Sequence, residues 1–211
     1  MEVQKKWEQL SEERRERLIE KHRDGEVQFE WWDFTYEGFV ERMGEIGVRT
    51  SAEEIYFSGF WSQGDGACFG GSVNDWEKFL TAAGKPELID FAREHDLHLY
   101  WQSSGRYSHE NSVDFSTEYL WSDNPHDEDD DPMRHAAWAA IHPGEGGPVY
   151  AASDDFEVFL RGKMRDLYSQ LEEEHDYLTS DEAVTEYILA NREDEIDEAL
   201  EEQAIEEEEV I

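Results

Sequence analysis

Two short turns contain the polar side chains in this sequence that are best suited to chemistry. The first turn holds Gln63 and Asp65, the latter flanked by glycines, and the second holds Arg106, His109 and Glu110. An aspartate or a histidine can transfer protons, and an arginine can hold a carboxylate or phosphate with two parallel hydrogen bonds. Each turn follows a strand-like aromatic segment, a pattern typical of a rigid scaffold that presents loops. We therefore expect the two turns to lie on one small sheet and to form one ligand- or partner-binding region.

The same side chains also have purely structural interpretations. Asp65 is suited to completing a turn, Arg106 to pairing with Asp65, and His109 to capping a strand end. The sequence contains no nucleophile elbow, Walker loop, HExxH motif or CxxC motif, and its histidines lack the spacing of metal ligands. We therefore favour binding over catalysis in this region and predict no catalytic residue, metal or cofactor.

A second group of candidates consists of carboxylates. The 211 residues include 54 Asp and Glu against 18 Lys and Arg, a formal charge of −36. This charge opposes direct contact with nucleic acid or anionic lipid, because phosphates are repelled over most of the surface, and it favours a basic partner. The residues expected to bind that partner lie in one loop and in the C-terminal tail: Asp127, Glu128, Asp129, Asp130, Asp131, Glu206, Glu207, Glu208 and Glu209.

The acidity can also arise without any partner, in two ways. One is solubility combined with a disordered acidic tail, and the second is adaptation to high salt, which the scarcity of lysine suits. A calcium-binding loop is not predicted over residues 127–138. Pro132 stands where an EF-hand has its sixth-position glycine, and Trp138 stands at the twelfth position.

The strands that must position the turns are recognisable from alternating apolar and polar residues. This pattern predicts strands over 53–62, 97–102 and 113–121. The first carries aromatic residues on both faces, which predicts a central strand covered on both sides. The second and third are separated by about ten residues, which favours an antiparallel hairpin.

Helical periodicity and capping residues complete an α+β fold, in which a small antiparallel sheet packs against several helices. Helices are predicted over 2–23, where Ser11 is suited to starting a second helix, over 35–47 and over 154–177, and after a capping box at Thr179–Glu182. We expect a single domain over residues 1–191 that begins with the N-terminal helix. Residues 192–211 are expected to form an acidic tail, either helical or disordered until it meets a partner.

The cellular compartment is predicted from what the sequence lacks. Cys68 is the only cysteine, so no disulfide can form within the chain, as is usual in a reducing compartment. The first 23 residues are charged, unlike a secretory signal, and no apolar run approaches the roughly 20 residues that cross a bilayer. We expect a soluble cytoplasmic protein with no membrane partner.

Three motifs resemble those of a family of small tailed-phage proteins, some of which are labelled antitoxins. They are Ser58–Phe69, Gly105–Glu110 and Tyr177–Val184, and the similarity extends from about Ile55 to Asn191. The resemblance implies a viral origin, an α+β core and the cytoplasm of a host cell. It implies no established reaction, and the acidity of the loop and tail departs from it.

These observations favour a viral, non-enzymatic protein that inhibits a host factor, such as a defence system, a toxin or a nucleic-acid-handling protein. An acid-rich helix rises about 1.5 Å per residue and can imitate the charge spacing of about 1.7 Å along duplex DNA. The expected partner is a basic host protein or a nucleic-acid-binding complex. The alternative is a small enzyme or a nucleotide- or ligand-binding protein that uses turns 63–66 and 106–110. A structural accessory protein of the virion is a third hypothesis.

Overall fold

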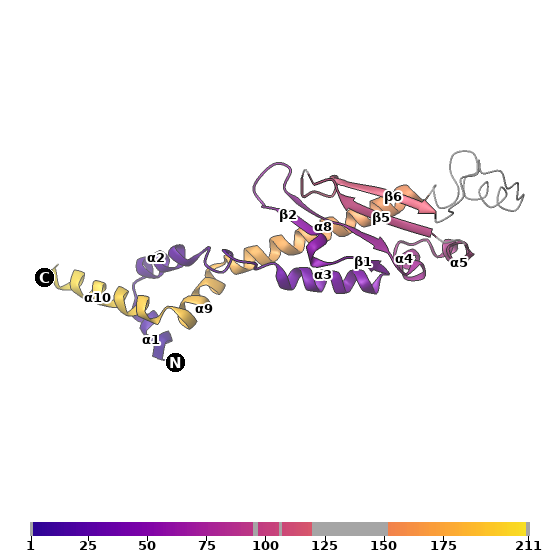
Figure 1. Ribbon diagram of the computed structural model, residues 1–211. Helices are drawn as coiled ribbons and strands as arrows, with labels where there is room; N and C mark the ends of the chain where they lie inside the picture. Colours follow the sequence, from indigo (N-terminus) through magenta and orange to yellow (C-terminus); the bar gives the residue numbers. More distant parts are fainter. Residues whose placement is uncertain (1, 95–96, 106, 120–151, 210–211) are drawn as a thin grey trace, which may run out of the picture. The chain divides into compact units, whose positions relative to one another are not determined.

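The computed structural model describes residues 2–94, 97–105, 107–119 and 152–209 (Figure 1). The chain divides into two compact units. The first unit, which we call the helical unit, combines residues 1–32 with residues 171–211, and the second, the sheet unit, comprises residues 33–170. The predicted boundary before residue 192 falls inside the helical unit, because the acidic tail packs there as a helix.

The described part of the sheet unit contains two antiparallel sheets. The larger has the strand order β1-β4-β5-β6 and consists of β1 (Val48–Arg49), β4 (Gly71–Val73), β5 (Leu97–Ser103) and β6 (Val113–Tyr119). The smaller is a hairpin of β2 (Ile55–Ser58) and β3 (Gly66–Phe69). The α+β prediction is confirmed, and so is the antiparallel pairing of the two long strands, in which Leu97 is opposite Tyr119 and Ser103 is opposite Val113.

The prediction for residues 53–62 was wrong in two respects. Strand β2 ends at Ser58, and it pairs only with β3 within the described strands, so it is not a central strand. The aromatic residues that suggested a strand covered on both faces continue into the hairpin loop, where Trp61 is exposed. The short strands β1, β3 and β4 were not predicted, because two to four residues are too few to show a period.

The core of the sheet unit is built from aromatic side chains of strands and helices. Its helices are α3 (Asp33–Glu45), α4 (Trp76–Ala82), α5 (Ile89–Glu94) and the first part of α8 (Ser153–Leu178), with short 3₁₀ turns at η1 (Ala52–Glu54) and η2 (Pro86–Leu88). Phe69 contacts Phe39 and Trp101 edge to face, and Phe79 contacts Phe156 in the same way. All five side chains are almost fully buried.

Gly47 allows the chain to turn tightly between α3 and β1. Its φ is +77°, and a Cβ at this position would lie 2.2 Å from the carbonyl oxygen of Asp75. The Gly47 carbonyl oxygen in turn accepts hydrogen bonds from the backbone N–H groups of Asn74 and Asp75. Asp75 then caps α4, because its side chain accepts a hydrogen bond from the backbone N–H of Lys78.

The helical unit contains α1 (Glu2–Gln9), α2 (Glu12–His22), the end of α8, α9 (Asp181–Asn191) and α10 (Glu193–Glu209). Ser11 starts α2 as predicted, because its side chain accepts a hydrogen bond from the backbone N–H of Arg14. Helix α9 starts one residue later than the capping box at Thr179–Glu182 predicts, since Ser180 is the N-cap and accepts from the backbone N–H of Ala183. A buried apolar cluster joins four helices: Trp7, Leu10, Leu18, Val184, Ile188, Ile196 and Ala199. The acidic tail is therefore a packed helix over Glu193–Glu209.

Among the described helices, none combines the length and the apolar character that crossing a membrane would need.

Candidate functional site

The two predicted turns lie against each other in the sheet unit. Gly66 follows the first turn, and a Cβ placed on it would lie 2.9 Å from Cδ2 of His109 and 3.2 Å from the carbonyl oxygen of Ser108. Such close approach leaves no room for a side chain at residue 66. The structure thus brings Asp65 and His109 into one neighbourhood, although the two turns follow strands of two separate sheets and not of one small sheet as predicted. Arg106 lies outside the described residues.

Asp65 closes the loop of the β2–β3 hairpin. Its Oδ2 accepts hydrogen bonds from the backbone N–H groups of Trp61, at 2.9 Å, and Ser62, at 2.6 Å. The Asp65 N–H donates to the Ser62 carbonyl oxygen at 3.1 Å, and Gly64 adopts a φ of +99° within the loop. The carboxylate is therefore used to hold the turn, and the neighbouring Gln63 is exposed.

His109 and Glu110 are also engaged within their own turn. Nδ1 of His109 lies 3.1 Å from the backbone nitrogen of Asn111 and 3.1 Å from a carboxylate oxygen of Glu110. A neutral Nδ1 accepts from Asn111, whereas a protonated Nδ1 donates to Glu110, so the two contacts are alternatives. Glu110 also lies 3.8 Å from a guanidinium nitrogen of Arg165.

Helix α8 fixes both turns from one side. Arg161 donates to the backbone carbonyl of Glu110 and packs its guanidinium 4.9 Å from the centre of the Phe115 ring. About two turns further along α8, the Tyr168 hydroxyl donates a hydrogen bond to the Gly59 carbonyl oxygen at 3.2 Å. Within the described residues no group of three His, Cys, Asp or Glu side chains is arranged to hold a metal ion. The two turns are therefore held in place by α8, and the side chains of Asp65, His109 and Glu110 are already engaged in contacts within the protein.

The acidic helix α10 is the second candidate site, and its inward side is paired with the basic N-terminal helices. Lys6 lies 2.8 Å from carboxylate oxygens of both Glu193 and Asp197. Glu195 lies 2.8 Å from Lys21 Nζ and 2.8 Å from His22 Nε2. Its hydrogen bond with Lys21, assisted by His22, lowers the pKa of the Glu195 carboxyl below its usual value.

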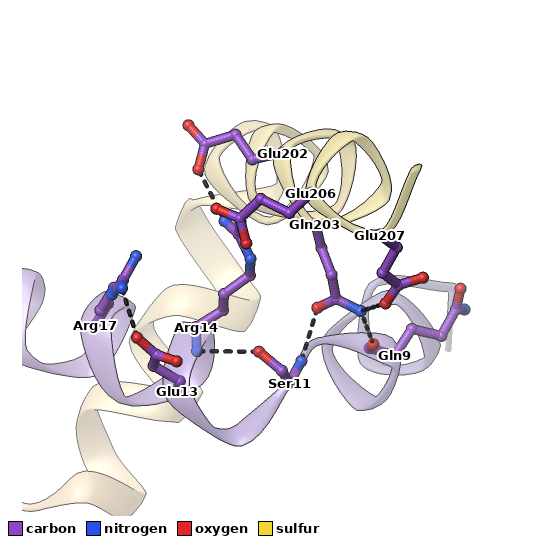
Figure 2. Close-up of polar contacts among 9 residues, drawn as sticks. All are labelled: Gln9, Ser11, Glu13, Arg14, Arg17, Glu202, Gln203, Glu206 and Glu207. Carbon is purple, nitrogen blue, oxygen red and sulfur yellow. Dashed lines mark hydrogen bonds and ion pairs between the residues drawn. The ribbon is translucent and has the colours of Figure 1, made fainter. Parts of the chain in front are cut away.

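Arg14 of α2 is a buried cation that contacts the C-terminal half of α10, and only 7% of its surface is exposed. Figure 2 shows Arg14 beside Glu202 and Glu206. The two terminal nitrogens of Arg14 lie 2.8 Å from a carboxylate oxygen of each. Beside it, Gln203 accepts a hydrogen bond from the Ser11 N–H at 2.9 Å and donates to the Gln9 carbonyl oxygen at 3.3 Å. These contacts fix α10 against the junction of α1 and α2.

The opposite side of α10 presents carboxylates to solvent. The exposed acids on this side are Asp194, Glu198, Glu201 and Glu208, and none of the four forms an ion pair within the described part of the chain. The hydrogen bond with Glu195 raises the pKa of Lys21, and the negative charges of Glu195 and Glu198 add to this effect. Intervals of four, three and seven residues place the four exposed acids on one stripe, opposite the buried Ile196 and Ala199. We call these four residues the outward acidic stripe.

The predicted acidic residues have different positions relative to this stripe. Glu206 pairs with Arg14, and Glu207 lies 3.4 Å from Gln203, whereas Glu208 belongs to the stripe. The side chain of Glu209 and the loop residues Asp127–Asp131 lie outside what the structure describes. Asp194, Glu198 and Glu201 lie in the acidic tail that the sequence indicated, but sequence reasoning did not single them out, because it did not determine which face of the helix points outward.

The charge of the chain is concentrated in the helical unit. Its 73 residues include 27 acidic and 8 basic side chains, a formal charge of −19, whereas the 138 residues of the sheet unit include 27 and 10, a charge of −17. The helical unit thus has about twice the charge per residue. If acidic residues were spread evenly over the protein, the net charge of each unit would be proportional to its number of residues.

Fold and site together define an α+β domain with two braced turns, extended by a helical unit that displays an acidic helix. The chain belongs to the family of the domain of unknown function DUF8835, which matches residues 31–181. This match covers the sheet unit and α8, and it leaves α1, α2, α10 and most of α9 outside. No curated protein and no solved structure matches the chain. The resemblance to tailed-phage proteins stays a prediction.

Proposed function

We propose that this protein is a non-enzymatic interaction protein that inhibits a host factor by offering the outward acidic stripe of α10 to a basic partner. The partner is a basic protein or a nucleic-acid-binding complex, and the stripe occupies the surface where that partner holds nucleic acid. A viral origin and action in the host cytoplasm are part of this proposal. In this proposal the family domain supports the helical unit, and helix α10 is the part that contacts the partner.

The observation that carries the proposal is the division of α10 into two faces. One face is anchored by Lys6, Arg14 and the buried apolar cluster, and the opposite face exposes four carboxylates. A disordered acidic tail would have to be ordered on binding, at a cost in conformational entropy. Helix α10 is already ordered by its packing against α1 and α2, so its carboxylates lose little further conformational entropy when a partner binds.

The charge density of α10 is of the size that imitation of nucleic acid requires. The helix has 11 acidic residues among 17 and no basic residue. At about 1.5 Å per residue it is about 25 Å long, which gives about one carboxylate per 2.3 Å. Duplex DNA has one charge per about 1.7 Å of its axis. Cations from α1 and α2 offset part of this charge on the anchored side, whereas the four carboxylates of the outward stripe form no ion pair within the described residues.

The test is a capture experiment with a charge-matched control. The stripe variant combines Asp194→Asn, Glu198→Gln, Glu201→Gln and Glu208→Gln. The control changes four exposed acids of the sheet unit, Glu37, Glu41, Glu45 and Glu87, to Gln. Both lose four negative charges, so any general effect of net charge is equal in the two proteins.

Each protein is immobilised and exposed to lysate of a candidate host at low salt, and the bound proteins are then eluted with duplex DNA. We expect wild type and control to capture basic proteins that DNA releases, and the stripe variant to lose them. Equal capture by the stripe variant, or bound proteins that duplex DNA leaves in place, would contradict the proposal.

A further inference from the structure

A second, unrelated feature lies on the outward face of the four-stranded sheet. Three side chains occupy one row across neighbouring strands, since Arg49 of β1 is opposite Ser72 of β4, and Ser72 is opposite Tyr100 of β5. Beside this row the surface is hollowed, with a volume of about 440 Å³. Pockets of about 300–1,000 Å³ hold small molecules in other proteins. Its lining consists of Arg49, Thr50, Ser51, Glu54, Gly71, Ser72, Tyr100, Trp101 and Gln102.

The backbone of Gly70, next to the lining residue Gly71, ties the segment that carries Thr50 and Glu54 to the start of β4. Its N–H donates to the Glu54 carbonyl oxygen at 2.8 Å, and its own carbonyl oxygen accepts from the Thr50 hydroxyl at 2.7 Å. A Cβ at Gly70 would meet Glu54 Cβ at 3.7 Å and Gln102 Cα at 3.8 Å, which is ordinary contact.

Two opposite charges line the hollow without neutralising each other. Arg49 and Glu54 are both exposed, and neither side chain forms an ion pair or a hydrogen bond within the described residues. Arg49 is distinctive in this respect. Each of the remaining described Lys and Arg side chains of the sheet unit is in an ion pair or a hydrogen bond: Arg42, Lys78, Lys85, Arg93, Arg161, Lys163 and Arg165.

A ligand that satisfies both groups must itself carry both charges. We propose that the hollow binds a free α-amino acid, with its carboxylate toward Arg49 and its ammonium group toward Glu54. Arginine suits a carboxylate because its parallel N–H groups match the two oxygens. Ser72 and Gln102 add neutral hydrogen-bonding groups, and the Tyr100 ring offers an apolar surface for the amino acid's side chain.

The charge of the whole chain supports a zwitterion over an anion. At a formal charge of −36, the field of the protein repels phosphates and simple carboxylates as they approach. A zwitterion has no net charge and escapes most of that repulsion. The hollow belongs to the sheet unit, within the family match, and so it is independent of the acidic stripe.

Calorimetric titration of the full chain with each of the twenty free amino acids tests the site. L-phenylalanine is accompanied by N-acetyl-L-phenylalanine, which lacks the ammonium charge, and by phenethylamine, which lacks the carboxylate. We expect saturable binding of one or more free amino acids, and a loss of about 10- to 100-fold on removal of either charge. No saturable binding of any of the twenty overturns the proposal.

Two variants assign each charge of the ligand to its residue. Glu54→Gln should weaken binding of the amino acid and make its N-acetyl derivative bind equally well, whereas Arg49→Gln should do the same for the decarboxylated amine. Glu87→Gln and Arg93→Gln are exposed controls outside the hollow and should retain wild-type binding. Unchanged discrimination in both hollow variants overturns the assignment. The stripe variant should bind amino acids normally, so the two proposals fail separately.

Discussion

At the scale of the residue, Asp65 shows how a side chain that resembles an acid–base group can be committed to structure. Its carboxylate satisfies two backbone N–H groups of the hairpin loop, and charge-assisted bonds of this kind are stronger than neutral ones. His109 in the neighbouring turn is similarly occupied by Asn111 or Glu110. By contrast, the side chains of Arg49 and Glu54 form no ion pair or hydrogen bond within the described residues, so these two residues are better candidates for binding a ligand.

We predict that Asp65→Ala lowers the free energy of unfolding of the sheet unit by about 1 kcal/mol, because two loop N–H groups lose their acceptor. Asp65→Asn keeps one side-chain oxygen as an acceptor and should lose less. Urea unfolding followed by near-ultraviolet circular dichroism measures both. Gln63→Ala is the control from the same loop, since Gln63 is exposed. An equal loss in Gln63→Ala would show that the Asp65 contacts contribute nothing specific.

At the scale of the element, α10 is held by apolar burial as well as by charge. Ile196 is fully buried, whereas Ile205, nine residues further along the same helix, is 58% exposed. The ion pairs around the helix involve largely exposed carboxylates such as Glu202 and Glu206, and pairs of this kind contribute little individually. Packing against Trp7 and Leu10 is therefore expected to supply most of the stability of the contact, while the ion pairs set the rotation of the helix.

Ile196→Ala should accordingly destabilise the helical unit by about 2–4 kcal/mol, because it leaves a cavity in the apolar cluster. The same change at Ile205 should have an effect within about 0.5 kcal/mol. Hydrogen exchange of residues 2–23 is the measurement, since loss of α10 packing would deprotect α1 and α2. Unaltered protection in Ile196→Ala would mean that the N-terminal helices fold without the acidic helix.

At the scale of the whole molecule, the excess of carboxylates makes self-repulsion a dominant long-range term. The chain has 54 acidic and 18 basic side chains, and 27 of the acids lie in the smaller helical unit. Dissolved salt screens such repulsion, with a Debye length of about 30 Å at 0.01 M and about 8 Å at 0.15 M. The short ion pairs of Lys6 and Arg14 are weakened by the same salt, so the two effects oppose each other.

We expect repulsion to prevail, so that the melting temperature rises between 0.01 M and 0.5 M sodium chloride by about 2–4 °C for each kcal/mol of repulsion removed. Differential scanning calorimetry at several salt concentrations measures this. A falling melting temperature would show that the intramolecular ion pairs outweigh the repulsion. A rise that continues undiminished above 1 M, where the Debye length is already about 3 Å, would instead favour adaptation to a high-salt habitat.

The sequence by itself determined the kinds of element and many of their limits. Ser11 and the segment Thr179–Glu182 mark helix starts to within one residue, and the alternation over 97–102 and 113–121 marks a paired hairpin. Such signals are readable because caps and periodicity depend on residues only a few positions apart. It also indicated that the turns containing Asp65 and His109 lie together, but it placed them on one small sheet, whereas they follow strands of two separate sheets.

Only the tertiary structure decided which polar side chains are engaged in contacts within the protein and which remain exposed to solvent. The face of α10 that points outward depends on contacts such as Lys6 with Glu193, which are 187 positions apart. The placement of Arg49 and Glu54 around one hollow depends on the pairing of β1, β4 and β5. Local pattern does not encode such pairings, because they arise when distant elements compete to bury their apolar faces, and the polar side chains take whatever neighbours that packing supplies.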